Sequence, residues 1–208
     1  MPNGGKFRRL LAVINYPRTL PVYLCALASK QRRLIKADID RWNEIDQINF
    51  NFFESLNWYL TYKKEFRNLV LHRLKKPSHG IVSMIHFAVS RIFWKPLETL
   101  YIYTDDIGGG LYIQHGFATI ITAKKIGENC RIYQQVTIGY KDGETPVLGD
   151  NVSVTCGAKV LGGITMHSGS LAAAGAVVIK DVPENAIVGG VPAKVIRIKS
   201  EAELGFQG

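Results

Sequence analysis

Cysteine is scarce in this sequence, and the few cysteines present form no recognisable pair. Cys25, Cys130 and Cys156 are widely spaced, odd in number and without a Cys-x-x-Cys motif. This pattern excludes a disulfide framework and a zinc ribbon. Free thiols suit a reducing compartment, so we predict a cytoplasmic protein.

An uninterrupted apolar segment is missing near the N-terminus. Lys6, Arg8 and Arg9 precede apolar residues, as they would in a signal peptide. Two prolines, Pro17 and Pro21, break the apolar stretch that follows, together with neighbouring polar residues. We therefore predict neither a signal peptide nor a membrane span in this segment.

Acidic residues are few in the first half of the chain. Residues 1–100 contain 17 Lys/Arg and 7 Asp/Glu, whereas residues 101–208 contain 9 and 10. The basic half could face an anionic membrane, nucleic acid or an acidic substrate, or it could be a solvated helical surface. No nucleic-acid-binding motif accompanies it, and we predict no nucleic-acid partner.

The first hundred residues lack the alternation typical of strands and contain helical patterns. Apolar residues recur at spacings of three and four over residues 48–75, and the pattern stops at the breaker sequence 77–80. A second run covers about 81–100 and is expected to end or kink near Pro96. A further helix is expected near 38–47, or extending from the twenties. The sequence therefore predicts a helical N-terminal domain over residues 1–100.

From Ile107 onward, an apolar residue recurs at every sixth position. The series is Ile107 and Ile113, then, shifted by one, Ile120, Ile126, Ile132 and Ile138, and, after the polar segment YKDGETPV, Leu148, Val154, Val160, Met166, Ala172 and Val178. With about half of all residues apolar, such a series arises by chance on the order of once in several thousand. Neither a helix nor a strand has a period of six.

A period of six is typical of a solenoid built from short strands. If each unit is one strand and one turn, three units make a triangular coil, and coils stack about 4.8 Å apart with one side chain per unit pointing inward. Coils at both ends then need caps. The helical half is expected to cap one end, and the segment 182–199, which leaves the rhythm, is expected to cap the other.

Three segments resemble hexapeptide-repeat acyltransferases and, within them, the serine acetyltransferase group. They are IGGGLYIQHG (107–116), KIGENCRIYQQVTIG (125–139) and VLGDNVSVTCGAKVLGGITMHSGSLAAAGAVVIKDVPENAIVGGVPAKVI (147–196). The resemblance implies a left-handed parallel β-helix over 101–198, with a C-terminal capping segment and a tail over 199–208. It also implies an acetyl-CoA-dependent O-acyltransferase that forms homotrimers, with acetyl-CoA in a groove between neighbouring prisms. Whether trimers pair further is left open.

His115, in the QHG segment, is the expected catalytic base. Acetyl transfer from a thioester to a hydroxyl needs a base because a neutral alcohol is a poor nucleophile, and histidine exchanges protons near neutral pH. We predict that Asp106 orients the second ring nitrogen of His115, with Asp105 as the alternative. The competing interpretation of His115 is a structural surface histidine.

Two departures from the family pattern bear on the acceptor. Gln114 stands where the family has an aspartate, and Glu144 and Thr145 stand where the serine enzymes have an Arg-His pair. A neutral glutamine cannot pair with an ammonium ion, and a loop without arginine cannot clamp a carboxylate. We therefore predict a saccharide hydroxyl of a surface-polysaccharide pathway as acceptor, bound by Gln114 and Tyr140. Serine O-acetylation in cysteine biosynthesis is the alternative, and a non-catalytic solenoid scaffold is an alternative of another class.

Small and basic residues at the matching motif positions are expected to bind acetyl-CoA. Small residues that let the pantetheine arm approach the backbone are Cys156, Gly157, Ala174 and Gly175, and cations for the phosphates are Lys180, Lys194 and Arg197. No metal is predicted, because a zinc site of the carbonic-anhydrase kind needs three histidines and the solenoid has only His115 and His167.

The basic N-terminal half also raises the question of a membrane contact. Basic residues interspersed with apolar ones are Lys6, Arg8, Arg9, Arg18, Lys30, Arg32 and Arg33. Such a segment could lie on an anionic membrane surface. It could equally pack on its own trimer mates.

Overall fold

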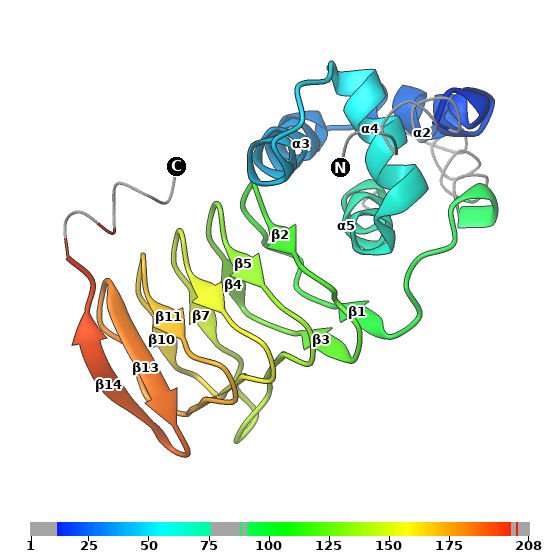
Figure 1. The fold of residues 1–208 in the computed structure, drawn as a ribbon. Coiled ribbons are helices and arrows are strands. Elements are labelled where there is room, and N and C mark those ends of the chain that lie inside the picture. The colour runs from blue at the N-terminus through cyan, green and yellow to red at the C-terminus, as the bar shows by residue number, and fades with distance from the viewer. Residues whose placement is uncertain (1–11, 76–87, 89–90, 201–202, 204–208) are drawn as a thin grey trace. The chain divides into compact units, whose positions relative to one another are not determined.

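The chain divides into two compact units, Met1–Leu97 and Glu98–Gly208. The computed structural model describes residues 12–75, 88, 91–200 and 203. In these residues the first unit is helical, and the second is a parallel β-solenoid (Figure 1). None of the helices within the described ranges has the length and apolar character needed to cross a membrane.

Aromatic packing forms the centre of the helical unit. Its elements are α2 (Tyr16–Ala28), α3 (Arg32–Asp46), α4 (Phe52–Tyr62) and α5 (Lys64–Leu74). Trp42 of α3 packs edge-on against Tyr59 of α4 and Phe66 of α5, with ring centroids 5.4 and 5.1 Å apart. All three side chains are buried, so one aromatic cluster joins three helices.

The single helix predicted over 48–75 is wrong, because two helices occupy this range. Lys63 has an extended backbone conformation and separates α4 from α5. Arg67 stabilises the break: its Nε donates to the carbonyl of Leu60 at 2.6 Å, and its Nη2 donates to the carbonyl of Thr61 at 3.0 Å. These bonds satisfy carbonyls that a helix leaves without partners where it ends.

The other helix predictions are met in part. The helix expected near 38–47, or from the twenties, corresponds to two helices, α2 and α3. Most of the run predicted over 81–100 lies outside the described residues. Its expected end near Pro96 is confirmed, since residues 91–93 are helical and 95–97 are not.

A buried ion pair ties α3 to α5. Nε and Nη2 of Arg73 donate to the two carboxylate oxygens of Asp38 at 3.0 and 3.1 Å. The side chain of Asp38 is fully buried and that of Arg73 is 4% exposed. A charge pair held this far from water depends on both partners, since either one alone would be an uncompensated buried charge.

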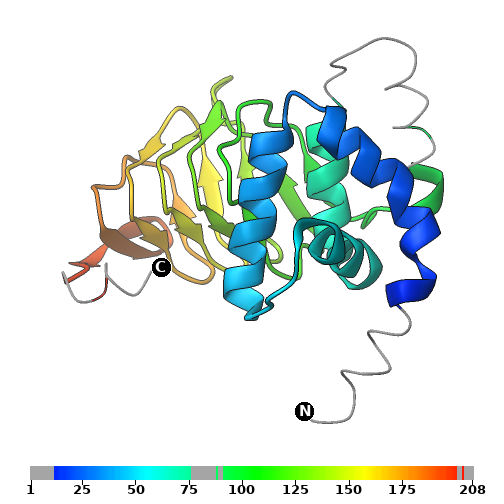
Figure 2. The ribbon, with the colours of Figure 1, turned by 90° about the horizontal axis from the view of Figure 1, so that it is seen from above.

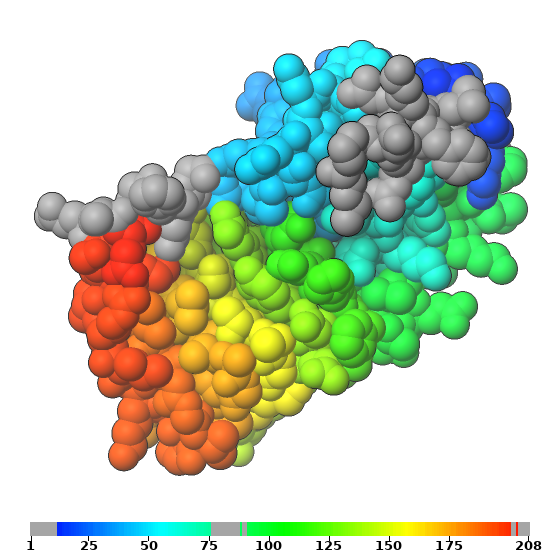
Figure 3. All heavy atoms as spheres, in the orientation of Figure 1, coloured from blue at the N-terminus to red at the C-terminus, as the bar shows by residue number. Residues whose placement is uncertain are grey.

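Three sheets of parallel strands form the faces of the solenoid (Figure 1). Face one comprises β1 (Leu100–Ile102), β3 (Thr119–Ile121), β6 (Thr137–Gly139), β9 (Lys159–Leu161) and β12 (Val177–Val178). Face two comprises β4 (Lys125–Ile126), β7 (Val147–Leu148) and β10 (Thr165–Met166). Face three comprises β2 (Tyr112–Ile113), β5 (Arg131–Ile132), β8 (Ser153–Val154), β11 (Leu171–Ala172), β13 (Ala186–Gly190) and the antiparallel β14 (Ala193–Ile198). The chain visits faces one, two and three in turn, and successive coils adjoin as bands in Figure 3.

Eleven of the twelve positions predicted to point inward are buried, and one prediction is wrong. Ile120 is 39% exposed, whereas its neighbour Ile121 is fully buried. Ile121 is also the residue in register with Ile138, the inward residue of the next coil. The inward residue that follows Ile113 is therefore Ile121, two residues later than the period of six predicts. The turn between them contains a two-residue insertion.

Close stacking of the coils accounts for glycine at the edge between faces two and three. A Cβ atom added to Gly127 would lie 2.5 Å from the carbonyl carbon of Gly149 in the next coil. At Gly143, in the loop between β6 and β7, an added Cβ would meet nothing within 4 Å, although φ is +81°. The first glycine is required by the neighbouring coil and the second by its own backbone conformation.

We expect Gly127→Ala to lower the free energy of unfolding by about 3 kcal/mol, because the coils must separate to admit the methyl group. Gly143→Ala is the control and should cost about 1 kcal/mol, from its left-handed backbone alone. Chemical denaturation of both variants measures the difference. Equal losses would contradict the stacking explanation.

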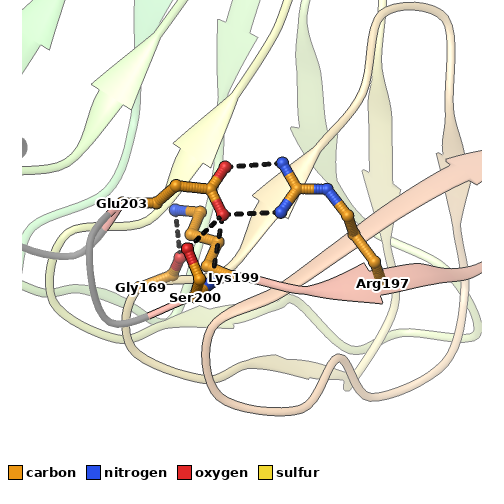
Figure 4. Close-up of polar contacts among 5 residues, drawn as sticks. All are labelled: Gly169, Arg197, Lys199, Ser200 and Glu203. Carbon is orange, nitrogen blue, oxygen red and sulfur yellow. Dashed lines mark hydrogen bonds and ion pairs between the residues drawn. The ribbon is translucent and has the colours of Figure 1, made fainter.

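The C-terminal segment covers the end of the solenoid at face three. β14 pairs antiparallel with β13, so the edge of face three is covered by a strand that does not continue the coil. Near the end of β14, Arg197 donates two hydrogen bonds to the carboxylate of Glu203 at 2.7 and 2.6 Å, and just after the strand Lys199 Nζ donates to the carbonyl of Gly169 at 2.5 Å (Figure 4). The hydrogen bond from Arg197 lowers the pKa of Glu203 to about 2. The predicted C-terminal cap is confirmed.

Candidate active site

The edge between faces three and one, which we name the His115 edge, carries several of the predicted site residues. Its turns in successive coils are Gln114–Ala118, Tyr133–Gln135, Thr155–Gly157 and Ala173–Gly175. The amide of Gly157 donates to the carbonyl of Gln134 at 3.0 Å, and the amide of Gly175 donates to the carbonyl of Cys156 at 2.9 Å. The small residues predicted to receive pantetheine thus lie in one column.

The inserted residues are His115 and Gly116. The amide of Gln114 donates to the carbonyl of Ile132, on face three of the next coil, at 2.9 Å. The carbonyl of Phe117 accepts from the amide of Gln135 at 3.0 Å. Gln114 and Phe117 are therefore in register with consecutive residues of the next coil, and the two residues between them have no counterpart there. The insertion is what sets the imidazole outside the stack of coils.

His115 has an unusual backbone conformation for a residue with a side chain. Its φ is +55°, and the amide of Phe117 donates to its carbonyl, closing a tight turn over Gly116. The regular turns of this edge also contain one left-handed residue, which is Ala118 in the first turn. His115 is thus an additional left-handed residue that costs about 1–2 kcal/mol. Its side chain is exposed, and backbone strain of this kind clusters at functional sites.

Apart from His115, the side chains of the turns along this edge are uncharged. They are Gln114, Phe117, Ala118, Tyr133, Gln134, Gln135, Thr155, Cys156, Ala173 and Ala174. Lys159 reaches the edge from face one, where its Nζ donates to the carbonyl of Gln135 at 2.7 Å. The edge therefore offers an imidazole beside neutral and small groups, which suits a base acting on a neutral hydroxyl next to a thioester.

Gln134 was missed by the sequence analysis. Its side-chain oxygen is buried and has no hydrogen-bond partner within the part of the chain that the structure describes. A buried acceptor without a partner favours binding of a donor from a ligand or water. No signal in the segment YQQV distinguishes Gln134 from Gln135, because which of the two faces inward depends on the geometry of the turn.

Comparison with known proteins identifies the family. No family model matches the chain. A serine acetyltransferase of Bacillus subtilis is 32% identical over 170 residues, which cover 79% of this chain and 76% of that relative. The chain belongs to the serine acetyltransferase family.

Other members of this family agree in sequence and structure. A serine acetyltransferase of Synechococcus elongatus is 41% identical over 95 residues, 43% of this chain and 39% of that protein. The crystal structure of serine acetyltransferase from Brucella abortus superposes with a TM-score of 0.62 at 26% identity, over 82% of this chain and 70% of that one. The crystal structure of Neisseria gonorrhoeae serine acetyltransferase in complex with serine superposes with a TM-score of 0.62 at 25% identity. The match covers 89% of this chain and 83% of that one. The predicted fold, a helical part followed by a left-handed parallel β-helix, and the predicted enzyme class, an O-acyltransferase, are confirmed.

Asp106 and Tyr140 do not lie on the His115 edge. Asp106 directly precedes Ile107, where the first coil enters face two, and Tyr140 begins the loop that leads from β6 to face two. Both therefore lie at the opposite border of face one, about 10 Å of strand away from His115. Within one protomer Asp106 is too far to orient the imidazole by a direct hydrogen bond. Asp106 was predicted because it is close to His115 in sequence, but the path of the coil places the two residues on different edges.

The three cations predicted to bind phosphate are dispersed. Lys194 lies in β14 opposite Gly189, at the end of β13 that leads into the His115 edge. Lys180 follows β12 and lies toward the opposite border of face one. Arg197 pairs near the start of β13, and its guanidinium is bound to Glu203. Of the three, Lys194 is the one that the fold places beside the small-residue column.

The three cysteines differ in their surroundings. Burial raises the pKa of Cys130 to about 12 and also raises that of Cys25. Cys156 is partly exposed on the His115 edge. Across the described residues no group of three His, Cys, Asp or Glu side chains is arranged to hold a metal ion.

Proposed function

We propose that this chain transfers the acetyl group of acetyl-CoA to the hydroxyl group of serine. The observation that carries the proposal is the two-residue insertion that sets His115 outside the coil stack, at the head of the column formed by Cys156–Gly157 and Ala174–Gly175. The names of the relatives, and a related structure in complex with serine, support serine above the saccharide predicted from the sequence.

His115 acts as the base in the proposed reaction. Its imidazole takes the hydroxyl proton while the hydroxyl oxygen bonds to the thioester carbonyl carbon, whose oxygen gains the negative charge. The carbon–sulfur bond of this tetrahedral intermediate then breaks, and the carbonyl forms again. The imidazolium returns the proton to the leaving thiolate, giving free CoA and the acetyl ester.

A saccharide is the second candidate acceptor because the described side chains of the turns along the His115 edge are uncharged. Serine carries an ammonium and a carboxylate group, which proteins bind with charge-assisted hydrogen bonds. Gln114 beside the base can offer only neutral hydrogen bonds. A sugar hydroxyl needs no counter-charge, so this edge would suit it within a single protomer.

The proposal includes the homotrimer and the cytoplasmic location predicted from the sequence. The outer surface of face one supports an assembly of this kind, since three large apolar side chains are exposed there, Tyr101, Tyr103 and Ile120. Exposed apolar patches commonly mark protein contacts. The mass of the protein in solution, measured by light scattering, tests the trimer directly.

An acceptor screen tests the function. Release of free CoA thiol is measured with acetyl-CoA and either L-serine or a panel of mono- and oligosaccharides. We expect release to require L-serine. Release with a saccharide and not with serine would select the second candidate. Absence of release with every acceptor, together with no heat of acetyl-CoA binding, would instead indicate a non-catalytic scaffold.

Cys156 provides a local probe of cofactor binding. Iodoacetamide is expected to alkylate Cys156 in the folded protein and to leave Cys130 unmodified, because Cys130 is buried and protonated. Desulfo-CoA, which has no thiol, should slow alkylation of Cys156 by about 100-fold at 100 times its dissociation constant. Mass spectrometry of the digested protein measures both rates. Unchanged alkylation at saturating ligand would place the cofactor elsewhere.

A further inference from the structure

We propose that the helical unit binds an anionic membrane surface through one face of α2 and the basic turn that follows it. This inference concerns a different unit from the proposed active site and does not depend on the acceptor. It rests on three features of the described residues: an exposed apolar stripe, a cluster of cations at its end, and the near absence of acidic groups around them.

The stripe runs along the outer side of α2 and the helical residues just before it. Its members lie at helical spacings and are all exposed: Val13, Pro17, Leu20, Leu24 and Ala28. The largest of them, Val13, Leu20 and Leu24, are 51%, 48% and 46% exposed. A row of apolar side chains at spacings of three and four forms one continuous face of a helix.

The opposite side of α2 is apolar too. Val22, Cys25 and Ala26 are buried in the helical unit, and Arg18 is the only charged residue of the helix. Arg18 is already engaged, because its guanidinium donates to Asn15 and to the carbonyl of Phe93. A helix with apolar residues on two faces normally has both faces covered, and α2 has one of them covered within the described chain.

Cations gather where the stripe ends. A short turn joins α2 to α3 (Figure 2), and the exposed basic residues there are Lys30, Arg32, Arg33 and Lys36. Lys36 pairs with Asp40 at the surface, whereas no ion pair of Lys30, Arg32 or Arg33 occurs among the described residues. Arg32 and Arg33 open α3, whose first turn holds no acidic residue. Positive charge is disfavoured at this end of a helix, so the stability of α3 does not explain the two arginines.

Acidic groups are absent from this part of the sequence. The first acidic residue of the chain is Asp38, eight Lys/Arg precede it, and its carboxylate is buried against Arg73. The other acidic groups of α3 and α4 are bonded to neighbours: Asp40 to Lys36, Glu44 to Arg41, Asp46 to Lys63, and Glu54 to the backbone amide of Asn51. The stripe and the cations therefore form a surface that is apolar along its length and positive at one end.

An anionic lipid surface complements both features at once. Leucine and valine side chains enter the boundary between headgroups and acyl chains, while lysine and arginine attract the headgroups. Thirteen residues of α2 extend about 20 Å, short of the about 30 Å needed to cross the hydrocarbon, so the helix would lie in the surface plane. A second copy fits less well, because an isologous contact would present the same apolar stripe and the same cations from both copies and would bring no acidic groups to pair with Arg32 and Arg33.

Sedimentation with lipid vesicles tests the proposal on the full chain. Vesicles of equal parts phosphatidylglycerol and phosphatidylcholine are compared with phosphatidylcholine alone. We expect binding to the anionic vesicles, weakened by added salt. Arg32→Gln with Arg33→Gln should lower the partition coefficient about 30-fold, and Leu20→Ser with Leu24→Ser at least about 10-fold.

Matched controls remove the same charge or apolar area elsewhere. Lys124→Gln with Lys125→Gln, and Ile196→Ser with Ile198→Ser, change exposed residues of the solenoid and should leave the partition coefficient unchanged. Thermal unfolding of the α2 variants should match the unmodified chain, since the changed side chains are exposed. Acetyl transfer without lipid is assayed separately and should be unaffected, so failure of this proposal is distinguishable from failure of the proposed function.

Two outcomes would overturn the inference. One is no binding to the anionic vesicles, equal binding to both kinds of vesicle, or binding that the α2 variants do not alter. The other is absence of vesicle binding together with a smaller assembly, measured by light scattering, when Leu20 and Leu24 become serine. That second outcome would show that another copy of the chain covers α2.

Discussion

His115→Ala is expected to lower kcat/KM for acetyl transfer about 1,000-fold, because the hydroxyl would lose the base that takes its proton. The side chain is exposed on a turn that the solenoid does not need for stacking, so the variant should remain folded. Steady-state release of CoA thiol measures the loss. Calorimetry should show acetyl-CoA binding little changed, since the small-residue column is intact.

Two further variants separate chemistry from folding. His115→Asn keeps a residue that tolerates the left-handed backbone, φ +55°, and should be as inactive as the alanine variant. His167→Ala changes the other histidine of the solenoid, which is exposed on a different edge, and should retain full activity. Activity that survives both changes at residue 115 would remove His115 from the mechanism.

Asp38→Ala is expected to lower the free energy of unfolding of the helical unit by about 3–5 kcal/mol. The cause is the Arg73 guanidinium, which is 4% exposed and would stay buried without the carboxylate that binds it at 3.0 and 3.1 Å. All three tryptophans of the chain, Trp42, Trp58 and Trp94, lie in this unit. Denaturation followed by tryptophan fluorescence therefore reports the unit by itself.

Asp40→Ala is the matched control for this experiment. Asp40 pairs with Lys36, and both side chains are more than half exposed, so the loss should stay below about 1 kcal/mol. Replacing both buried partners by apolar residues of similar size, Asp38→Leu with Arg73→Met, should restore much of the stability. Equal losses for Asp38→Ala and Asp40→Ala would show that the buried pair is not essential.

The solenoid could be predicted from the sequence because the inward residues of each coil recur as apolar residues at every sixth position. One apolar position in six is needed wherever three short strands enclose a core, and eleven of the twelve positions satisfied it. The exception, Ile120, lies in β3, the strand that follows the inserted residues. Ile120 and Ile121 are both apolar, so the pattern alone could not decide which one points inward.

The helical unit was harder to predict in detail. Apolar spacing continues through Lys63, and the break between α4 and α5 depends on hydrogen bonds from Arg67 to carbonyls six and seven residues earlier. Such contacts have no signature in periodicity. The sequence could indicate the helical class of this half, whereas the number of helices depended on side-chain bonds that form only in the folded unit.

The candidate site was predictable where it follows from the coil and not where it requires long-range geometry. Cys156, Gly157, Ala174 and Gly175 share the turn positions of consecutive coils, so their column follows from the repeat. Asp106 is near His115 in sequence, yet one coil carries the chain through two faces between them. The pairing of Arg197 with Glu203 could likewise not be inferred, because it depends on how the chain turns after β14.

Hydrogen exchange on addition of desulfo-CoA tests most directly whether the turn with the displaced histidine is where acetyl transfer takes place. Exchange should slow at the amides of 114–118, 156–157 and 174–175, which lie in different coils and share a single edge. The glycines at the edge between faces two and three, Gly108, Gly127 and Gly149, should exchange as before. Slowing at those glycines alone, or at no part of the solenoid, would contradict the assignment.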